Sequence, residues 1–270
     1  MSPALVKAPR RLGVKADRRL GLTPRGWSVV GIVLILAVLE LSPRLGLIDS
    51  FSLPPLSTIL VHAGALLVNG PFWVADLLPT LIAMAWSFVL ASVLGVLVGL
   101  ALWRFRVLRR IVDPWLTVYY AIPTFALYPM LVVIAGVGLV PIVLLGTLLA
   151  IVAVVTSTMD GLDSTPRIAL RLSDSLQLSP LERTMKILLP SAVEQINIGL
   201  RLALSFSIIG VLASEFILST HGLGHFISNA SEDFAMGDMY GGIVLVLVLA
   251  FGLNFAFSSL LRKRTRRIHA

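Results

Sequence analysis

Long apolar stretches, broken at intervals by short polar and charged stretches, run through most of this 270-residue chain. The longest uncharged stretch lies between Asp113 and Asp160, where 46 residues contain no Asp, Glu, Lys or Arg. As one helix it would reach roughly 69 Å at about 1.5 Å per residue, which is about twice the roughly 30 Å hydrocarbon core of a bilayer. The stretch is therefore expected to fold back on itself within a membrane.

Six apolar segments have about the length needed to cross a membrane, which predicts an all-α protein with six transmembrane helices. They are residues 27–41, 77–103, 115–135, 139–159, 192–218 and 239–261. Two glycines and a proline within 136–141 favour a tight reversal between the third and fourth segments. Pro190 predicts a break before the fifth. Seven basic residues precede the first segment, as in a signal peptide, but no small-x-small cleavage pattern follows it, so we expect it to be retained.

The segment 54–69 has a different pattern, because its apolar residues recur at helical spacing but the segment is too short to span a membrane. Prolines precede it, and Gly70-Pro71 follows it. We expect a helix that lies on the external membrane surface. Its apolar positions are Leu56, Ile59, Leu60, Ala63, Leu66 and Leu67.

The basic residues indicate how the spans are oriented, because Lys and Arg collect on the cytoplasmic side of a membrane protein. Seven lie before the first span, four in 104–110, four in 167–186 and five in 262–267, and all twenty fall on one side if the helices alternate. The exceptions are Arg44 and Arg201, while the loop 219–238 has no basic residue and three acids. Both termini are therefore predicted to be cytoplasmic.

Composition agrees with a membrane protein, since 57% of the residues are hydrophobic, 13% are charged and the mean hydropathy is +0.94. Soluble domains have roughly 45–50% apolar residues. The absence of cysteine excludes disulfide scaffolds, thiolate metal sites and cysteine nucleophiles. A net charge of +8 could indicate a nucleic-acid partner, but the basic residues flank apolar segments without interleaved aromatic residues, so no nucleic acid is expected.

The predicted organisation is a basic cytoplasmic tail at 1–26, a transmembrane domain at 27–261 and a second basic tail at 262–270, with the tails poorly ordered.

The predicted cytoplasmic loop, 160–190, is long, amphipathic and rich in helix-start signals. Thr165-Pro166 can start one short helix. Ser179-Pro180-Leu-Glu182 matches a capping box, with Ser179 as the cap and Glu182 reaching back to it. Two short helices that meet at a bend near Gln177 are therefore predicted; a simple solvated connector is the alternative.

The end of this loop carries the motif Ser179-Pro180 followed by Ile187-Leu-Leu-Pro190. It resembles the end of the cytoplasmic "EAA" loop of six-helix, binding-protein-dependent ABC importer permeases. The resemblance runs from about Phe51 to the C-terminus and is closest to the branch that handles nitrate, sulfonates, taurine and bicarbonate. The other matching motifs, in order, are Leu53-Pro54-Pro55, Asp113-Pro114, Ala121-Ile-Pro123, Tyr128-Pro129, Gly136-Val-Gly138, Glu215, His221-Gly-Leu-Gly224, Asn229-Ala230 and Asp238.

The loop also departs from the family pattern. Arg171 stands at the family's glutamate, Leu172 and Ser173 at its two small residues, and Gln177 at its bend glycine. Arg171 reverses the charge at the expected ATPase contact. A second, non-identical permease in the assembly is therefore left open beside a second copy of this chain.

The resemblance implies a type I importer permease that moves a small solute, such as a nitrate-, sulfonate-, taurine- or bicarbonate-like anion, by alternating access. The implied partners are an ABC ATPase dimer, an extracytoplasmic solute-binding protein and a second permease. ATP and Mg would be bound by the ATPase, and no cofactor is expected in this chain. The residues implied to couple to the ATPase are Arg171, Gln177, Leu178, Ser179, Pro180, Leu181 and Glu182.

Several residues in or beside the spans are candidates for a translocation pathway or gate. Glu215 lies late in the fifth span, where a carboxylate that faced lipid would be costly, so it should face protein or water. A hydrated acid at the external surface is the alternative. Tyr120, Pro123, Thr124 and Phe125 interrupt the third span and could line a cavity; a packed kink is the alternative.

The segment His221-Gly-Leu-Gly-His225, with Glu232 and Asp233 downstream, could indicate a metal site. The intervening glycines argue against a helical pair of ligands. We therefore expect no metal, and expect a flexible external loop in which His221, Gly222 and Gly224 contact the binding protein.

Two rival functions remain at this stage. An independent secondary transporter or channel would show paired repeats and buried ionisable residues in broken helices, and of these only Glu215 stands out. An intramembrane enzyme would need a catalytic motif such as H-E-x-x-H or G-x-S-x-G, and the sequence has neither. None of the four lysines lies in a G-x-x-x-x-G-K-[ST] loop, so ATP hydrolysis is expected on another polypeptide.

Overall fold

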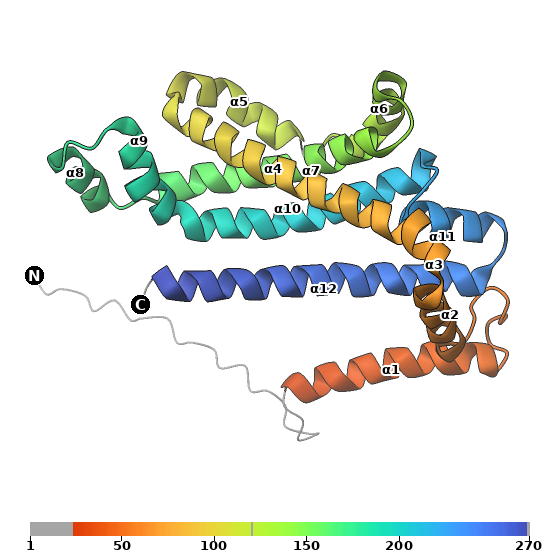
Figure 1. The fold of residues 1–270 in the computed structure, drawn as a ribbon. Coiled ribbons are helices and arrows are strands. Elements are labelled where there is room, and N and C mark those ends of the chain that lie inside the picture. The colour runs from red at the N-terminus through yellow and green to blue at the C-terminus, as the bar shows by residue number, and fades with distance from the viewer. Residues whose placement is uncertain (1–23, 120, 269–270) are drawn as a thin grey trace, which may run out of the picture. The chain divides into compact units, whose positions relative to one another are not determined.

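The computed structural model describes residues 24–119 and 121–268, and all regular elements within these ranges are helical (Figure 1). Five helices are long and apolar enough to cross a membrane, and a bent helix pair supplies a sixth crossing if it counts as one span. The α-helices are α1 (Pro24–Arg44), α2 (Leu56–Val68), α3 (Gly70–Phe72), α4 (Leu78–Arg104), α5 (Arg106–Tyr119), α6 (Tyr128–Ala135), α7 (Leu139–Asp163), α8 (Arg167–Ser175), α9 (Pro180–Arg183), α10 (Leu189–Leu218), α11 (Leu223–Glu232) and α12 (Met236–Ile268). Two π-helical turns, η1 (Trp73–Leu77) and η3 (Thr184–Leu188), and a 3-10 turn, η2 (Thr124–Leu127), complete the set. The prediction of an all-helical membrane protein is confirmed.

The chain divides into two compact units, residues 1–56 and residues 57–270. In the first unit, α1 is the only regular element of the described part. Its apolar side chains are exposed along the helix, with Ile32 at 59% and Leu34 at 63%. An apolar helix that is exposed on all sides is typical of a segment surrounded by lipid.

The second unit is built around α7, which packs between α4 and α10. Small residues allow the close approach: a Cβ on Gly146 would lie 2.6 Å from Ser87 Oγ of α4, and one on Gly210 of α10 would lie 2.8 Å from the Gly146 Cα. Small residues at helix contacts are typical of membrane proteins, in which dispersion contacts replace the hydrophobic effect. Larger side chains at these positions would force the three helices apart.

Gly95 and Gly99 form a small-xxx-small motif on α4, a pattern that predicts close packing of a neighbouring helix of the same subunit. A Cβ on Gly95 would lie 2.6 Å from Val154 Cβ, and one on Gly99 would lie 2.7 Å from Thr158 Cβ. Both neighbours belong to α7. The prediction is confirmed, and the motif is used inside the subunit.

The predicted break at Pro190 is wrong, because the helix continues from α9 through η3 into α10. Proline lacks a backbone N–H and crowds the preceding turn of an α-helix. The wider π-turn η3 accommodates the proline ring without ending the helix, since the Leu189 N–H bonds to the Thr184 carbonyl five residues back. The same device precedes Pro79, where the Leu78 N–H bonds to the Trp73 carbonyl of η1.

The third predicted span also begins elsewhere. We expected this span at residues 115–135, but α5 already starts at Arg106, one residue after α4 ends at Arg104. Charge marks the membrane boundary and does not prevent helix formation, because arginine is a good helix former. The basic segment 262–268, expected to be poorly ordered, likewise continues α12.

The predicted interfacial helix is present as α2, and Ile59, Ala63 and Leu66 form its buried face. Ala63 and Leu66 pack in one cluster with Leu223 of α11 and Leu245 of α12. A hydrogen bond of 2.7 Å between His62 Nδ1 and Asp238 Oδ1 adds a polar contact between α2 and α12. The helix is therefore anchored to the second unit along one face.

Candidate functional site

The loop between α7 and α10 folds into a compact elbow, residues 167–183, in which α8 and α9 meet at Gln177. Gln177, at the predicted bend, has φ of 48°, the left-handed conformation. The Leu178 N–H bonds to the Ser173 carbonyl at 3.2 Å, and the Gln177 N–H bonds to the Asp174 carbonyl at 3.1 Å. This pattern is a Schellman motif, with glutamine where glycine is usual, at a strain of about 1 kcal/mol.

The start of α9 is fixed by the predicted capping box. The Glu182 N–H donates to Ser179 Oγ at 3.3 Å, and the Ser179 N–H donates to Glu182 Oε2 at 3.2 Å. Arg183 Nη1 lies 2.9 Å from Asp174 Oδ1, which ties α9 to α8. Both sides of the bend are thus held by hydrogen bonds, so the elbow is a stiff element.

The elbow presents apolar side chains on its surface. Leu181 is 69% exposed and Leu176 is 59% exposed, whereas Leu178 is half-buried. Leu178, one of the residues implied to couple to the ATPase, is less exposed than Leu176 and lines a groove beside the end of α4. Arg171, Gln177, Ser179 and Pro180 are exposed around these leucines.

A second polar site surrounds Glu215, which is 2% exposed near the end of α10. Its carboxyl group accepts from the Gly224 N–H at 2.9 Å, and Thr80 Oγ1 of α4 lies 2.8 and 2.9 Å from its two oxygens. Thr80 Oγ1 in turn accepts from the Leu223 N–H at 2.8 Å. The carboxyl group and the hydroxyl thus satisfy free N–H groups in the first turn of α11, where negative charge is favourable.

Glu215 therefore links three helices and is surrounded by protein, as expected for a carboxylate late in a span. Its exposure of 2% does not fit the alternative of a hydrated surface acid. The role of Glu215 as a gate stays a prediction. Its partner Thr80 could not be inferred from the sequence, because the two residues are 135 positions apart. The N–H donors in the first turn of α11 could be recognised only once this segment was known to be helical.

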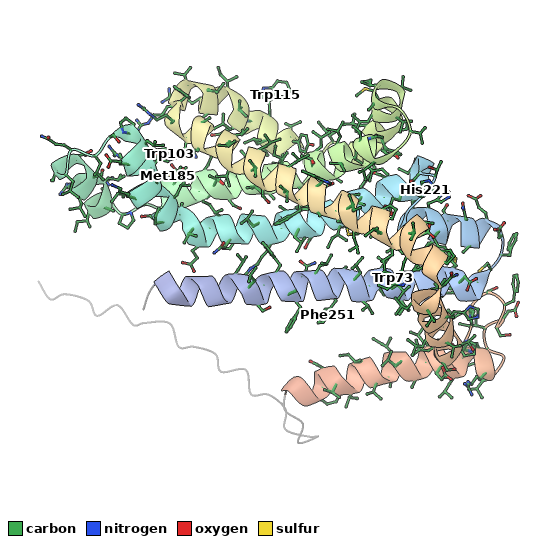
Figure 2. All side chains as sticks on the ribbon, in the orientation of Figure 1. Trp73, Trp103, Trp115, Met185, His221 and Phe251 are labelled. Carbon is green, nitrogen blue, oxygen red and sulfur yellow. The ribbon has the colours of Figure 1, made fainter. Side chains whose placement is uncertain are left out.

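The segment after α10 is more ordered than predicted, because α11 occupies most of the expected flexible loop. Gly222 has φ of 107°, and a Cβ on it would collide with the Glu215 carboxyl group. Gly222 and Gly224 are buried, which differs from the expectation that they contact a binding protein, since a buried glycine has no surface to offer a partner. His221 is exposed and projects near the start of α11 (Figure 2).

The histidines at this end do not form a metal cluster. His225 lies in α11 and its Nε2 pairs with Asn229 Nδ2 at 2.9 Å, whereas His221 precedes the helix. Within the part of the chain that the structure describes, no group of three or more His, Cys, Asp or Glu side chains is arranged to hold a metal ion.

The third span is interrupted where the sequence predicted. The segments 106–119 and 124–135 meet at an angle of 97°, and the 3-10 turn η2 begins at Thr124 after Pro123. Pro123 is exposed, Thr124 is buried, and Phe125 packs against the core between α4, α7 and α10. Tyr120, the other pathway candidate, lies outside the described residues. Among those described, no hydrogen bond joins this break to Glu215, and the pathway role of these residues stays a prediction.

Comparison with known proteins agrees with this architecture. Residues 91–269 match the family described as binding-protein-dependent transport system inner membrane component. The chain belongs to this family, and it is a multi-pass inner-membrane transport subunit of an ABC importer, not an enzyme.

The chain is similar to named relatives, and its fold is similar to that of a solved structure. The taurine transport system permease protein TauC of Escherichia coli is 28% identical over 244 residues, 88% of each chain. The nitrate import permease protein NrtB of Synechococcus elongatus is 26% identical over 178 residues, which cover 66% of this chain and 63% of the relative. The MetNI methionine ABC transporter, solved in inward facing conformations, contains a chain with a TM-score of 0.59 and 22% identity, covering 72% of this chain and 98% of that chain. The structural likeness shows a shared fold.

Proposed function

We propose that this permease imports a small anion by alternating access, and that a separate ABC ATPase drives it through the elbow. The observation that carries the proposal is the elbow itself, a stiff element with exposed leucines between two core helices. A stiff element can transmit a nucleotide-driven movement, whereas a flexible loop would absorb it. The ATPase dimer binds ATP and Mg, and a solute-binding protein delivers the substrate at the opposite side, where His221 is exposed.

The proposed substrate class is supported by the relatives, since TauC and NrtB are named for taurine and nitrate. Both are compact solutes: taurine carries a sulfonate group, and nitrate is an oxyanion. The second permease of the assembly is either a copy of this chain or a related chain. Arg171 favours a related chain, because it puts a positive charge where the family has a negative one.

Uptake measurements test this function. Deleting the gene should abolish ATP-driven uptake of at least one labelled probe among taurine, nitrate, an aliphatic sulfonate and bicarbonate, and supplying the gene again should restore it. Inactivating the ATPase by mutation should have the same effect as the deletion. Uptake that persists without the ATPase and follows an ion gradient would instead identify a secondary transporter, and would overturn the proposal.

The proposal also requires that the elbow be cytoplasmic and α11 external, as the one-sided basic residues predict. The chain has no cysteine, so single cysteines can be introduced at exposed Ser164 and Ser231 and treated in intact cells with a membrane-impermeant thiol reagent. We expect labelling of Ser231→Cys only, with Ser164→Cys reacting after the membrane is permeabilised. Cysteines at Ser2 and Ala270 should behave like Ser164→Cys. Labelling of Ser164→Cys from outside would contradict the orientation.

A further inference from the structure

A cavity of two adjacent parts, which share lining residues, lies in the second unit where the end of α4 meets α5, α9 and η3. One part is a groove of about 750 Å³ with mostly apolar walls, and the other is a polar pocket of about 330 Å³. Trp103 and Arg104 line both parts. Figure 2 shows Trp103 beside Met185 of η3, which lines the groove. The groove is lined by Leu97, Leu100 and Ala101 of α4, by Met185 and Leu188, and by the elbow residues Leu178, Pro180, Leu181 and Arg183.

The polar pocket carries positive charge that the protein does not neutralise. Its charged lining residues are three arginines and Asp163. The charge of Arg109 is neutralised by two ion pairs, because its Nη2 lies 2.8 Å from Asp163 Oδ2 and its Nε lies 3.4 Å from Asp113 Oδ2. Arg104 and Arg106 are exposed and form no ion pair with any carboxylate that the structure describes. These two guanidinium groups are available to an anion.

One further side chain points to a ligand in this pocket. Thr165 lines it and is 6% exposed, yet its hydroxyl has no hydrogen-bond partner among the described residues. A buried hydroxyl without a partner costs about 1–3 kcal/mol, so an acceptor from a bound molecule would relieve it. Trp103 Nε1 donates to Asp163 Oδ1 at 3.1 Å, which fixes the indole at the junction of the two parts.

We propose that this cavity binds an anionic phospholipid, with its phosphate in the polar pocket and an acyl chain in the groove. An anionic phospholipid has a charged head group and an apolar tail, and this cavity offers a cationic pocket next to an apolar groove at the end of a membrane-spanning helix. Basic pockets between transmembrane helices on the cytoplasmic side suit anionic head groups. The proposal rests on the proposed orientation of the spans but does not depend on transport. A free phosphate ion would use the arginines and leave the groove unoccupied.

Lipid binding to the purified full chain tests the site. In neutral detergent, native mass spectrometry should detect retained phosphatidylglycerol in preference to phosphatidylcholine with the same acyl chains. Arg104→Gln and Arg106→Gln should each weaken phosphatidylglycerol binding about fivefold, the contribution of one basic side chain near an anionic surface. Arg110→Gln is the matched control, because Arg110 is exposed on α5, the helix of Arg106, and lines neither part of the cavity. This variant should bind phosphatidylglycerol like the wild type.

A groove variant separates a lipid from a free anion. Ala101→Phe narrows the groove and should weaken phosphatidylglycerol binding, while millimolar inorganic phosphate should compete poorly. Equal binding of phosphatidylcholine would overturn the proposal. So would phosphate binding as tight as lipid binding that Ala101→Phe leaves unchanged, which would indicate a free-anion site. Complete displacement of the lipid by the partner ATPase would show that the cavity is a subunit contact.

Discussion

Glu215→Ala should greatly lower both the melting temperature and the membrane abundance of the protein. The change removes the acceptor of the buried Gly224 N–H, and it leaves the Asp76 carbonyl, 3.0 Å away, as the acceptor for the Thr80 hydroxyl, which still accepts from the Leu223 N–H. A lost hydrogen bond to a charged group and a buried donor without a partner together give an expected loss of about 2–4 kcal/mol in the free energy of unfolding. Because the carboxyl group joins α4, α10 and α11, the loss should affect this whole end of the unit.

Matched variants separate this structural role from a role in transport. Glu215→Gln keeps the shape and one acceptor oxygen, so it should be milder than Glu215→Ala. Glu232→Ala removes an exposed carboxylate from the end of α11 and should leave the melting temperature unchanged. Thermal unfolding in detergent and quantitative blotting of membranes provide the measurements. If Glu215→Ala had wild-type stability and only lost transport, Glu215 would be a pathway residue after all.

Leu181→Asp should separate transport from ATP hydrolysis or prevent assembly with the ATPase, although membrane insertion remains normal. Leu181 is 69% exposed on the elbow, so the change costs little in the isolated chain. In an apolar groove of the ATPase, however, the new carboxylate would be buried without a partner, at an expected cost of about 3–5 kcal/mol. Copurification with the ATPase and ATP hydrolysis in proteoliposomes measure the effect.

Two controls accompany Leu181→Asp. Leu181→Met keeps an apolar side chain of similar volume and should assemble like the wild type. Leu47→Asp places the same carboxylate at a position that is 74% exposed outside the elbow, and it should have no effect on assembly. Wild-type assembly and transport in Leu181→Asp would mean that the elbow is only a connector.

The elbow was largely predictable because its determinants are close together in the sequence. Ser179 and Glu182 form the capping box within four consecutive residues, and the resemblance located the bend at Gln177. The partial burial of Leu178 could not be predicted, since it depends on where the elbow lies against the end of α4. The continuity through Pro190 was missed as well, because proline predicts a break unless a π-turn precedes it.

The sequence by itself determined the class of this protein. Apolar segments of spanning length and one-sided basic residues depend only on local composition, and the membrane requires helices wherever such segments cross it. The tertiary structure decided what individual residues do. Glu215 joins three helices because helix packing brings Thr80, 135 positions away in the sequence, into hydrogen-bond contact with it. Gly222 and Gly224 are buried because they pack against the Glu215 side chain. Contacts between segments so far apart in the sequence follow from helix packing, which no local pattern encodes.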